Sequence, residues 1–260
     1  MSAVAFSGVS KLFPGHGAGD EAVLALREVS FGVADQEFCS ILGHSGCGKT
    51  TLLMMLAGFE APSSGRILVD GRLVDRPTWR RSVVFQDYAL FPWMTVEENI
   101  AFGLEMKRVP RAERRAIVRR NIELVGLQGF ERRYPHQLSG GMKQRVSIAR
   151  ALAVDPEVLL MDEPFAALDA QNRSHMQEEM GRILASADPQ VRKTMVLVTH
   201  SIEEAILLSD RVVVLTRRPG RVKAELRVEL PRPRHESDSG FLELKQRIRD
   251  LIHDELEPEH

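Results

Sequence analysis

Apolar and polar positions along the chain follow two periods, and their order predicts a mixed α/β protein. Strand-like runs cover residues 4–13 and 23–33, and in the second run Val29, Phe31 and Val33 share one face. Short buried-strand patterns recur at residues 37–42, 65–69, 82–86, 158–162, 194–198 and 212–215. Because helical runs separate the later strands, we expect a mainly parallel sheet covered by helices on both faces.

One long helical region interrupts this alternation. From residue 95 to residue 154 the period is helical, and Thr95 and Glu98 have the spacing of a capping box. Ser201 and Glu204 repeat that spacing, and Asp70-Gly71 predicts a hairpin turn. We therefore expect an α/β domain over residues 1–230 with a helical insert at about residues 88–154, and a linker and helix at residues 231–260.

The segment after the strand at residues 37–42 has the composition of a phosphate-binding loop. A strand, a glycine-rich loop and Gly-Lys-Thr at a helix start form the context that this motif requires. Glycines let successive N–H groups point at an anion, and the helix N-terminus adds partial positive charge. Lys49 can reach the β- and γ-phosphates, and the Thr50 hydroxyl can hold Mg²⁺. The predicted nucleoside triphosphate site consists of Gly43, His44, Ser45, Gly46, Cys47, Gly48, Lys49, Thr50 and Thr51.

An acidic pair follows a second apolar strand. Asp162 and Glu163 come directly after residues 158–161, at the predicted carboxyl end of the strand. Ligands of open α/β sheets collect at that edge. Asp162 can hold Mg²⁺ directly or through a water molecule, and Glu163 can polarise an attacking water. A solvated turn is the alternative, and the phosphate loop upstream makes it the weaker interpretation.

A second helix start carries anion-binding features. Ser139, Gly140 and Gly141 precede residues that continue with helical spacing, so N–H groups at this end can also meet an anion. An ordinary serine N-cap with glycines for a tight entry explains the same residues. A chain with one phosphate loop gains from a second such site when that site faces the nucleotide of another subunit.

Composition narrows the class of protein further. A formal net charge of −1 leaves no electrostatic footprint for nucleic acid. The two cysteines, Cys39 and Cys47, do not make a disulfide framework and fit a reducing cytosol. We see no secretory leader, and no apolar run long enough to span a bilayer, so we expect a soluble protein.

Taken together, these motifs resemble those of the ATP-binding subunits of ABC transporters, and the resemblance covers nearly the whole chain to about residue 230. Residues 138–145, Leu-Ser-Gly-Gly-Met-Lys-Gln-Arg, match the signature of that family, and both phosphate-site motifs accompany it. The resemblance implies an α/β fold with a P-loop NTPase (RecA-like) core and mainly parallel sheet. It also implies an N-terminal antiparallel β subdomain and an inserted α-helical subdomain.

The resemblance implies further site residues, with ATP and Mg²⁺ as cofactors. Gln86 matches a Mg²⁺ and water contact that also senses the membrane partner. His200 matches a histidine that contacts the γ-phosphate, and Asp169 matches a residue at the dimer seam. Phe13 lies where the family stacks an aromatic ring on adenine, and a core phenylalanine is the alternative there. The implied catalytic residues are Glu163, His200, Lys49 and Gln86, and the implied metal ligands are Thr50, Gln86 and Asp162.

The implied partners are a second copy or paralogue of the ATPase subunit, transmembrane permease subunits and a periplasmic or lipid-anchored solute-binding protein, with no nucleic acid. The chain would lie on the cytoplasmic face of the membrane. Residues 84–93, 165–171 and 218–221 are similar to importer ATPases of the nitrate, sulfonate and taurine group, although Ala166 replaces the usual glycine. An exporter subunit, an importer of another solute and a non-transport ABC ATPase stay as alternatives.

Three other segments leave two interpretations open. Residues 88–93 crowd apolar and aromatic side chains, which predict a groove for a partner helix or else a buried core segment. The basic run of Arg111, Arg114, Arg115, Arg119 and Arg120 is a solvated face or a surface near anionic lipid. In the tail, an apolar helical face packs on its own domain or serves as a docking surface, and its members are Phe241, Leu244, Ile248, Leu251 and Ile252.

Overall fold

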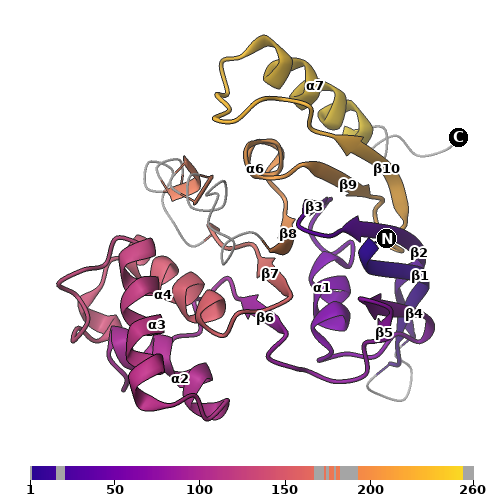
Figure 1. Cartoon of the computed structure of the whole chain (residues 1–260). Coiled ribbons are helices and arrows are strands. Elements are labelled where there is room, and N and C mark those ends of the chain that lie inside the picture. Colours follow the sequence, from indigo (N-terminus) through magenta and orange to yellow (C-terminus); the bar gives the residue numbers. More distant parts are fainter. Residues whose placement is uncertain are drawn as a thin grey trace, which may run out of the picture. The chain divides into compact units, whose positions relative to one another are not determined.

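The computed structural model describes residues 2–15, 21–166, 173, 176–178, 180–181 and 193–253. The chain forms two compact units (Figure 1). The first unit combines Met1–Thr78 with Thr194–His260, and the second unit is Trp79–Lys193. Within the described ranges, no helix has both the length and the apolar character needed to cross a bilayer.

The first unit opens with an antiparallel sheet in the order β2-β1-β4-β5. Its strands are β1 (Ser2–Phe13), β2 (Val23–Ala34), β4 (Ser64–Val69) and β5 (Arg72–Leu73). The predicted face of Val29, Phe31 and Val33 is buried. The predicted turn joins β4 to β5, with φ of 48° at Asp70 and 75° at Gly71, which explains why a glycine and an aspartate stand there.

A second sheet in the first unit carries the core. It contains β3 (Phe38–Leu42), β8 (Thr194–Thr199), β9 (Arg211–Leu215) and β10 (Val222–Arg227). Every residue of β3 is buried, and β3 pairs in parallel with both β8 and β9. The antiparallel strand β10 beside β9 was not predicted, although Val222, Ala224 and Leu226 alternate with charged residues.

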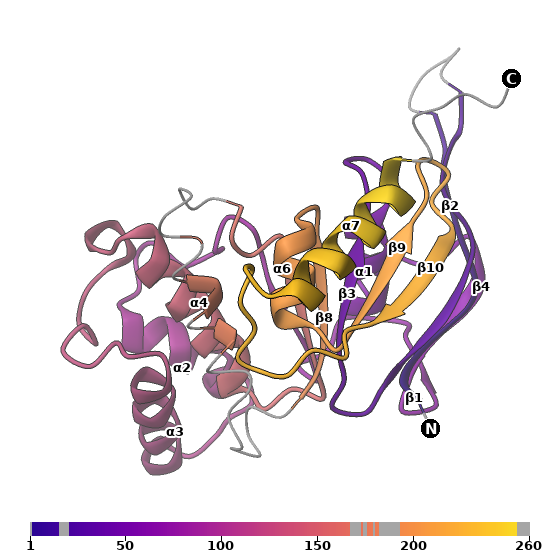
Figure 2. The same cartoon turned by 90° about the horizontal axis from the view of Figure 1, so that it is seen from above.

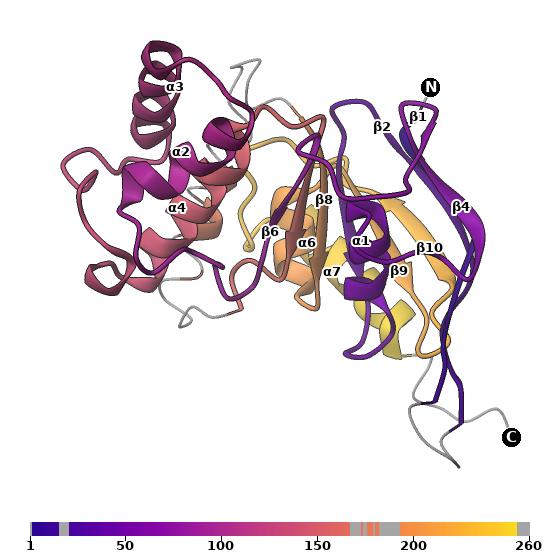
Figure 3. The same cartoon turned by 90° about the horizontal axis from the view of Figure 1, so that it is seen from below.

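Helices cover this sheet as the sequence predicts. The first, α1 (Lys49–Ala57), packs against β8 and ends at Gly58, whose left-handed φ of 87° closes the helix. The next, α6 (Ile202–Leu208), packs against β3 and β8 (Figure 3). The Ser201 side chain accepts a hydrogen bond from the Glu204 N–H at 3.1 Å, as the predicted N-cap requires.

The predicted C-terminal helix is α7 (Ser239–His253), which lies over α6 and β9 (Figure 2). Phe241 and Ile248 are buried in one cluster with Leu42, Ile206 and Val212. Three further tail residues pack against that cluster, namely Leu244, Leu251 and Ile252. Of the two interpretations of this apolar face, packing on its own domain is therefore confirmed.

The second unit combines a strand pair with a helical bundle (Figure 3). Strands β6 (Arg81–Val84) and β7 (Val158–Asp162) pair in parallel. The helices are α2 (Val96–Met106), α3 (Arg111–Leu124), the 3₁₀ turn η1 (Pro135–Gln137) and α4 (Gly140–Ala153). Both hydrogen bonds of the predicted capping box form between Thr95 and Glu98. The three α-helices share a buried core that includes Ile100, Val118 and Val146.

Candidate functional site

The phosphate loop of the first unit joins β3 to α1, as the sequence predicts. Gly46 and Gly48 have φ values of 78° and 99°, a left-handed region that side chains other than glycine rarely adopt. Gly48 also caps α1, and its carbonyl accepts the Leu52 N–H at 2.9 Å. The loop therefore delivers the chain directly into the N-terminus of a helix, which is the geometry that binds phosphate.

Lys49 lies inside this loop. Its side chain folds back, and Nζ donates to the carbonyls of Gly43 at 2.8 Å and His44 at 2.9 Å. The same His44 carbonyl accepts the N–H of Cys47 at 3.3 Å. Because Lys49 is only 5% exposed, its charge is held where the loop closes rather than in solvent. Lys49, the first residue of α1, thus ties the helix to the two carbonyls at the start of the loop.

Parallel pairing brings His200 to the same edge of the sheet. Leu42 of β3 is in register with Thr199 of β8. The next residues along the two strands are Gly43, the first residue of the loop, and His200, which is exposed. Two segments far apart in the sequence therefore leave adjacent strands at one level, as expected for a ligand edge in an α/β sheet.

The second unit repeats this arrangement with acidic and amide groups. Val84 of β6 is in register with Met161 of β7. Gln86 follows the end of β6 by two residues, and Glu163 follows β7 directly. Asp162 is the last residue of β7 and is 9% exposed. The structure thus brings Gln86, Asp162 and Glu163 to one carboxyl edge, and their oxygens suit Mg²⁺ and water.

Glu163 adopts an unusual backbone conformation. Its φ of 44° is left-handed, which costs a residue with a side chain roughly 1–2 kcal/mol. A turn holds this conformation, since the Glu163 carbonyl accepts the Ala166 N–H at 3.1 Å. Such strain persists only where the surrounding structure imposes it, and it is common where a side chain must be aimed at a reacting group.

Ser139 caps α4, as the ordinary interpretation of its position predicts. Its Oγ accepts the Met142 N–H at 3.3 Å, and its carbonyl accepts the Lys143 N–H at 2.9 Å. Ser139 is exposed, and Gly140 and Gly141 follow in the first turn. Capping and anion binding are compatible here, because the Ser139 side chain uses the Met142 N–H and leaves the N–H groups of Gly140 and Gly141 without an intrahelical acceptor.

Two further predicted nucleotide contacts are Phe13 and Asp169. Phe13 ends β1 opposite Val23 and is half-buried, so it is not a core residue, and the Lys11 ammonium lies 5.0 Å from its ring centroid. Its contact with adenine stays a prediction. Asp169 lies outside the described residues.

The segment at residues 88–93 is a surface loop rather than core. Trp93 is 69% exposed, and the Phe91 ring lies between the rings of Phe102 and Trp93. Tyr88 and its neighbour Ala89 have left-handed φ values, and Arg150 donates to both of their carbonyls. The interpretation as a buried core segment is therefore wrong for the exposed tip of this loop.

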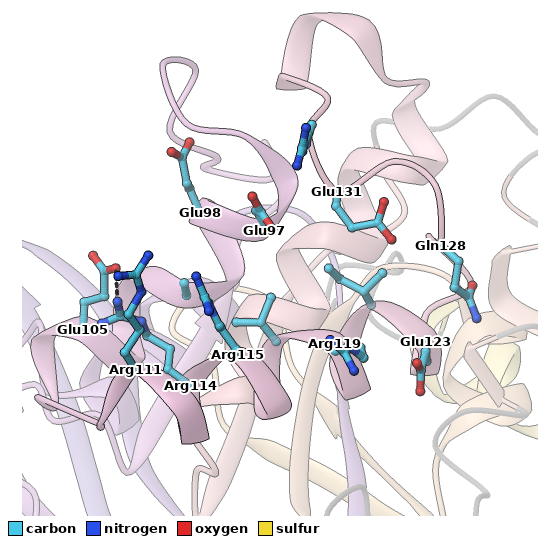
Figure 4. A pocket seen from close by; sticks show the side chains of 14 residues that line it. Glu97, Glu98, Glu105, Arg111, Arg114, Arg115, Arg119, Glu123, Gln128 and Glu131 are labelled. Atoms are coloured by element: carbon cyan, nitrogen blue, oxygen red, sulfur yellow. Dashed lines mark ion pairs between the residues drawn. The ribbon is translucent and has the colours of Figure 1, made fainter.

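The basic run on α3 faces solvent beside acidic residues. A groove of about 650 Å³ between α2 and α3 is lined by arginines and glutamates in similar number (Figure 4). Arg114 pairs with Glu105 at 3.2 Å, and Arg111, Arg115 and Arg119 are exposed. Mixed charge of this kind is typical of a solvated face and gives anionic lipid no single-sign surface.

Comparison with known proteins now identifies the family. A model of the ABC transporter family matches residues 26–166. An ABC transporter ATP-binding protein of Methanocaldococcus jannaschii is 50% identical over 248 residues, which cover 95% of this chain and 90% of that protein. The chain belongs to the ABC transporter ATP-binding family. This ABC ATPase binds and hydrolyses ATP, and the resemblance seen in its motifs is confirmed.

Several relatives have names that include a transported solute, which is nitrate, bicarbonate or an aliphatic sulfonate. The aliphatic sulfonates import ATP-binding protein SsuB of Bacillus cereus is 42% identical, with 94% of each chain covered. The nitrate import ATP-binding protein NrtC of Synechococcus elongatus is 50% identical over 81% of this chain. The ABC ATPase spans only 32% of the length of NrtC, which is a longer protein.

Solved structures confirm the fold class. The ATP-binding cassette MJ0796, in a dimeric post-hydrolysis state bound to ADP and phosphate, superposes with a TM-score of 0.71 at 29% identity. The superposition covers 88% of the ABC ATPase and all of the cassette. The predicted P-loop core with parallel strands, an N-terminal antiparallel sheet and a set of helices is therefore the fold of this chain.

Proposed function

We propose that this ABC ATPase powers an importer of a small anion such as nitrate, bicarbonate or a sulfonate. The observation that carries the proposal is the match to SsuB, because it covers 94% of each chain. Residues 84–93 and 218–221 support the same group. The ATPase would lie at the cytoplasmic face of the membrane, attached to permease subunits. A solute-binding protein would deliver the transported solute to those subunits.

The candidate site residues are proposed to bind and hydrolyse ATP. The phosphate loop of residues 43–51 would hold the phosphates, with Lys49 and His200 meeting the γ-phosphate. Thr50, Gln86 and Asp162 are proposed as Mg²⁺ ligands. Within the described part of the chain, no group of three or more acidic, histidine or cysteine residues is arranged to hold a metal ion.

Chemistry is assigned to Glu163. Its carboxylate would orient the attacking water, while Lys49 and the metal meet the charge that develops on the transferred phosphoryl group. When bound, Mg²⁺ neutralises phosphate charge. Phe13 would stack on adenine, and Asp169 would lie at the seam between two subunits.

Two copies, or a copy and a paralogue, are proposed to face each other head to tail. Each ATP would then lie between one Lys49 loop and the Ser139, Gly140 and Gly141 turn of the other subunit. The exposed loop at residues 88–93 is proposed to receive a permease helix, because Trp93 presents an exposed ring beside Pro92. The helical subdomain at about residues 88–154 would carry this contact.

An uptake experiment tests the proposal. A strain without this gene is assayed for uptake of labelled nitrate, bicarbonate and an aliphatic sulfonate. Expression of the normal chain should restore uptake of one anion, and expression of Lys49→Ala should not. Normal uptake of all three anions in the deletion strain would count against the importer assignment, and secretion of a substrate that depends on this gene would favour the exporter alternative.

A further inference from the structure

A second loop of the first unit is built against the phosphate loop. This bracing loop, defined as residues 216–221, connects β9 to β10. Thr216 organises it, since its Oγ1 donates to the carbonyl of Pro219 at 3.1 Å and accepts the Arg221 N–H at 2.9 Å. The Thr216 N–H in turn donates to the Arg221 carbonyl at 2.9 Å. The bracing loop is therefore a closed, hydrogen-bonded turn rather than a free connection.

Gly220 anchors the bracing loop to β2 and to the phosphate loop. Its N–H donates to the Ala25 carbonyl at 2.9 Å, and its carbonyl accepts the Arg27 N–H at 3.0 Å. A Cβ atom added to Gly220 would lie 2.2 Å from the carbonyl oxygen of Cys47, a backbone atom of the phosphate loop. Only glycine allows so close an approach, so the two loops are in direct backbone contact.

Arg218 makes the polar contact between the loops. Its Nε donates to the carbonyl of Gly46 at 3.1 Å. The N–H on the other side of that same peptide unit belongs to Cys47, and it donates to the His44 carbonyl. The peptide between Gly46 and Cys47 is thus held at its oxygen and at its nitrogen. We propose that Arg218 is a positioning residue that holds the phosphate loop in its anion-binding conformation.

The physical reason lies in the conformation of Gly46. With φ of 78° and no side chain, this residue has wide conformational freedom in the absence of an external contact. A charged donor on its carbonyl restricts that freedom, so less entropy is lost when phosphate binds. The guanidinium also leaves a positive charge beside the loop. The proposal rests on residues 43–51 being the phosphate site, and not on the identity of any transported solute.

The test measures dissociation constants for ATP and ADP with the full-length chain. Arg218→Ala should raise both dissociation constants by roughly tenfold, because the freed loop loses more conformational entropy when phosphate binds. Arg218→Lys should recover part of the loss, because an ammonium also donates. Arg221→Ala is the matched control, since Arg221 lies on the bracing loop and its backbone makes the bonds to Thr216. This control should bind like the normal chain.

Hydrolysis and melting separate positioning from general structure. Arg218→Ala should raise the KM for ATP while kcat changes less than about twofold, because the contact acts on binding. The melting temperature without nucleotide should not move, since Arg218 is exposed. Gly220→Ala, which pushes on the Cys47 carbonyl, should raise the same dissociation constants.

Two results would overturn the proposal. One is an unchanged ATP dissociation constant in Arg218→Ala. The other is an equal loss of affinity in Arg218→Ala and Arg221→Ala. Lys49→Ala distinguishes the bracing role from the phosphate site itself. If Lys49→Ala loses affinity and Arg218→Ala does not, the bracing role alone fails. If Lys49→Ala binds ATP normally, the phosphate site and the bracing role fail together.

Discussion

At the scale of single residues, the candidate site depends on a few positions where backbone conformation and side-chain chemistry coincide. Glu163 combines a carboxylate with a left-handed φ of 44°, and Gly46 and Gly48 combine left-handed φ with a place beside Lys49. In each case the conformation is one that the sequence tolerates only with strain or with glycine. At this scale, the proposed function depends on the directions in which the Glu163 carboxylate and the Lys49 ammonium point.

Glu163→Gln should separate ATP binding from hydrolysis. The amide keeps the shape of the side chain and removes its charge, so we expect hydrolysis to fall by roughly 10²–10⁴-fold while ATP still binds. A long-lived ATP-bound dimer should then be visible by size-exclusion chromatography. Glu157→Gln is the control, because Glu157 lies just before the other end of β7 and pairs with Arg80. Near-normal turnover in Glu163→Gln would remove Glu163 from the mechanism.

At the scale of elements, the C-terminal segment is tied to the first unit by polar contacts as well as apolar ones. Arg234 is buried and donates to backbone carbonyls of Ile206, Ser209, Val228 and Leu230. Two of these carbonyls lie at the C-terminal end of α6, where a cation also meets the negative end of the helix dipole. Arg234 therefore satisfies carbonyls at the C-terminal end of α6 and holds the start of the C-terminal segment against the first unit.

Arg234→Met should destabilise the first unit. Several buried carbonyls would lose their donor, and each such loss costs roughly 1–3 kcal/mol, so we expect the free energy of unfolding to fall by about 2–4 kcal/mol. Denaturant titration of the full chain measures it. Arg249→Met, on the exposed side of α7, should change the free energy of unfolding by less than about 0.5 kcal/mol. Equal effects of the two substitutions would contradict this account of Arg234.

The end of α7 also contacts the phosphate loop. The His44 ring nitrogen Nε2 lies 3.3 Å from the Ile252 carbonyl, in the last turn of the helix. This contact is a second way in which an element far along the chain restrains residues 43–51. The packing of the tail on its own domain therefore brings the C-terminal end of α7 to the loop.

At the scale of the whole molecule, stability in acid depends on a carboxylate that joins several strands. Arg211 of β9 forms two hydrogen bonds to Glu37, at 2.7 Å and 3.0 Å, and also bonds Glu225 and the Gly32 carbonyl. Burial raises the pKa of Glu37, but the hydrogen bonds from Arg211 and from the Ala34 N–H outweigh it, and the pKa of Glu37 is lowered.

A lowered carboxyl pKa has a definite consequence for unfolding. The unfolded chain binds a proton at Glu37 more readily than the folded chain does, so this pair stabilises the fold above pH 4.5 and that contribution is lost as the pH falls below it. Glu37→Gln should lower the free energy of unfolding by about 1–3 kcal/mol at pH 7. The difference from the normal chain should shrink in acid. A difference that stays constant from pH 7 to acid would contradict the assignment.

Assembly is the other property of the whole molecule. Each proposed composite site needs one Lys49 loop and one Ser139 turn from another subunit. Lys49→Ala and Ser139→Arg chains, both carrying Glu163→Gln, should therefore fail to dimerise with ATP when alone. Mixed together, they form one whole site, so dimers should return in size-exclusion chromatography. Tagged chains show whether the two variants associate with each other. If they do and the mixture still forms no more ATP-dependent dimer than either variant alone, Ser139 serves its own subunit.

Local patterns in the sequence determined much of this protein. The Gly-Lys-Thr loop, the capping box of Thr95 and Glu98 and the Asp70-Gly71 turn are set by neighbours a few residues apart, so their conformations follow from local rules. The buried strands follow from apolar runs for the same reason. The signature at residues 138–145 is a contiguous run of the sequence, so it indicates the family by itself, and the family match agrees.

Contacts between distant segments were decided by the tertiary structure alone. The order of the strands brings His200 to the edge where Gly43 lies, and it pairs the strands that lead to Gln86 and Glu163. Local sequence patterns do not determine strand order. The contacts of Arg218 with Gly46 and of Arg234 with α6 join residues far apart in the chain, where their sequence neighbourhood shows only polar, proline-containing turns. Such contacts depend on the packing of the whole sheet, because burial and backbone pairing select them only after the strands have found their order.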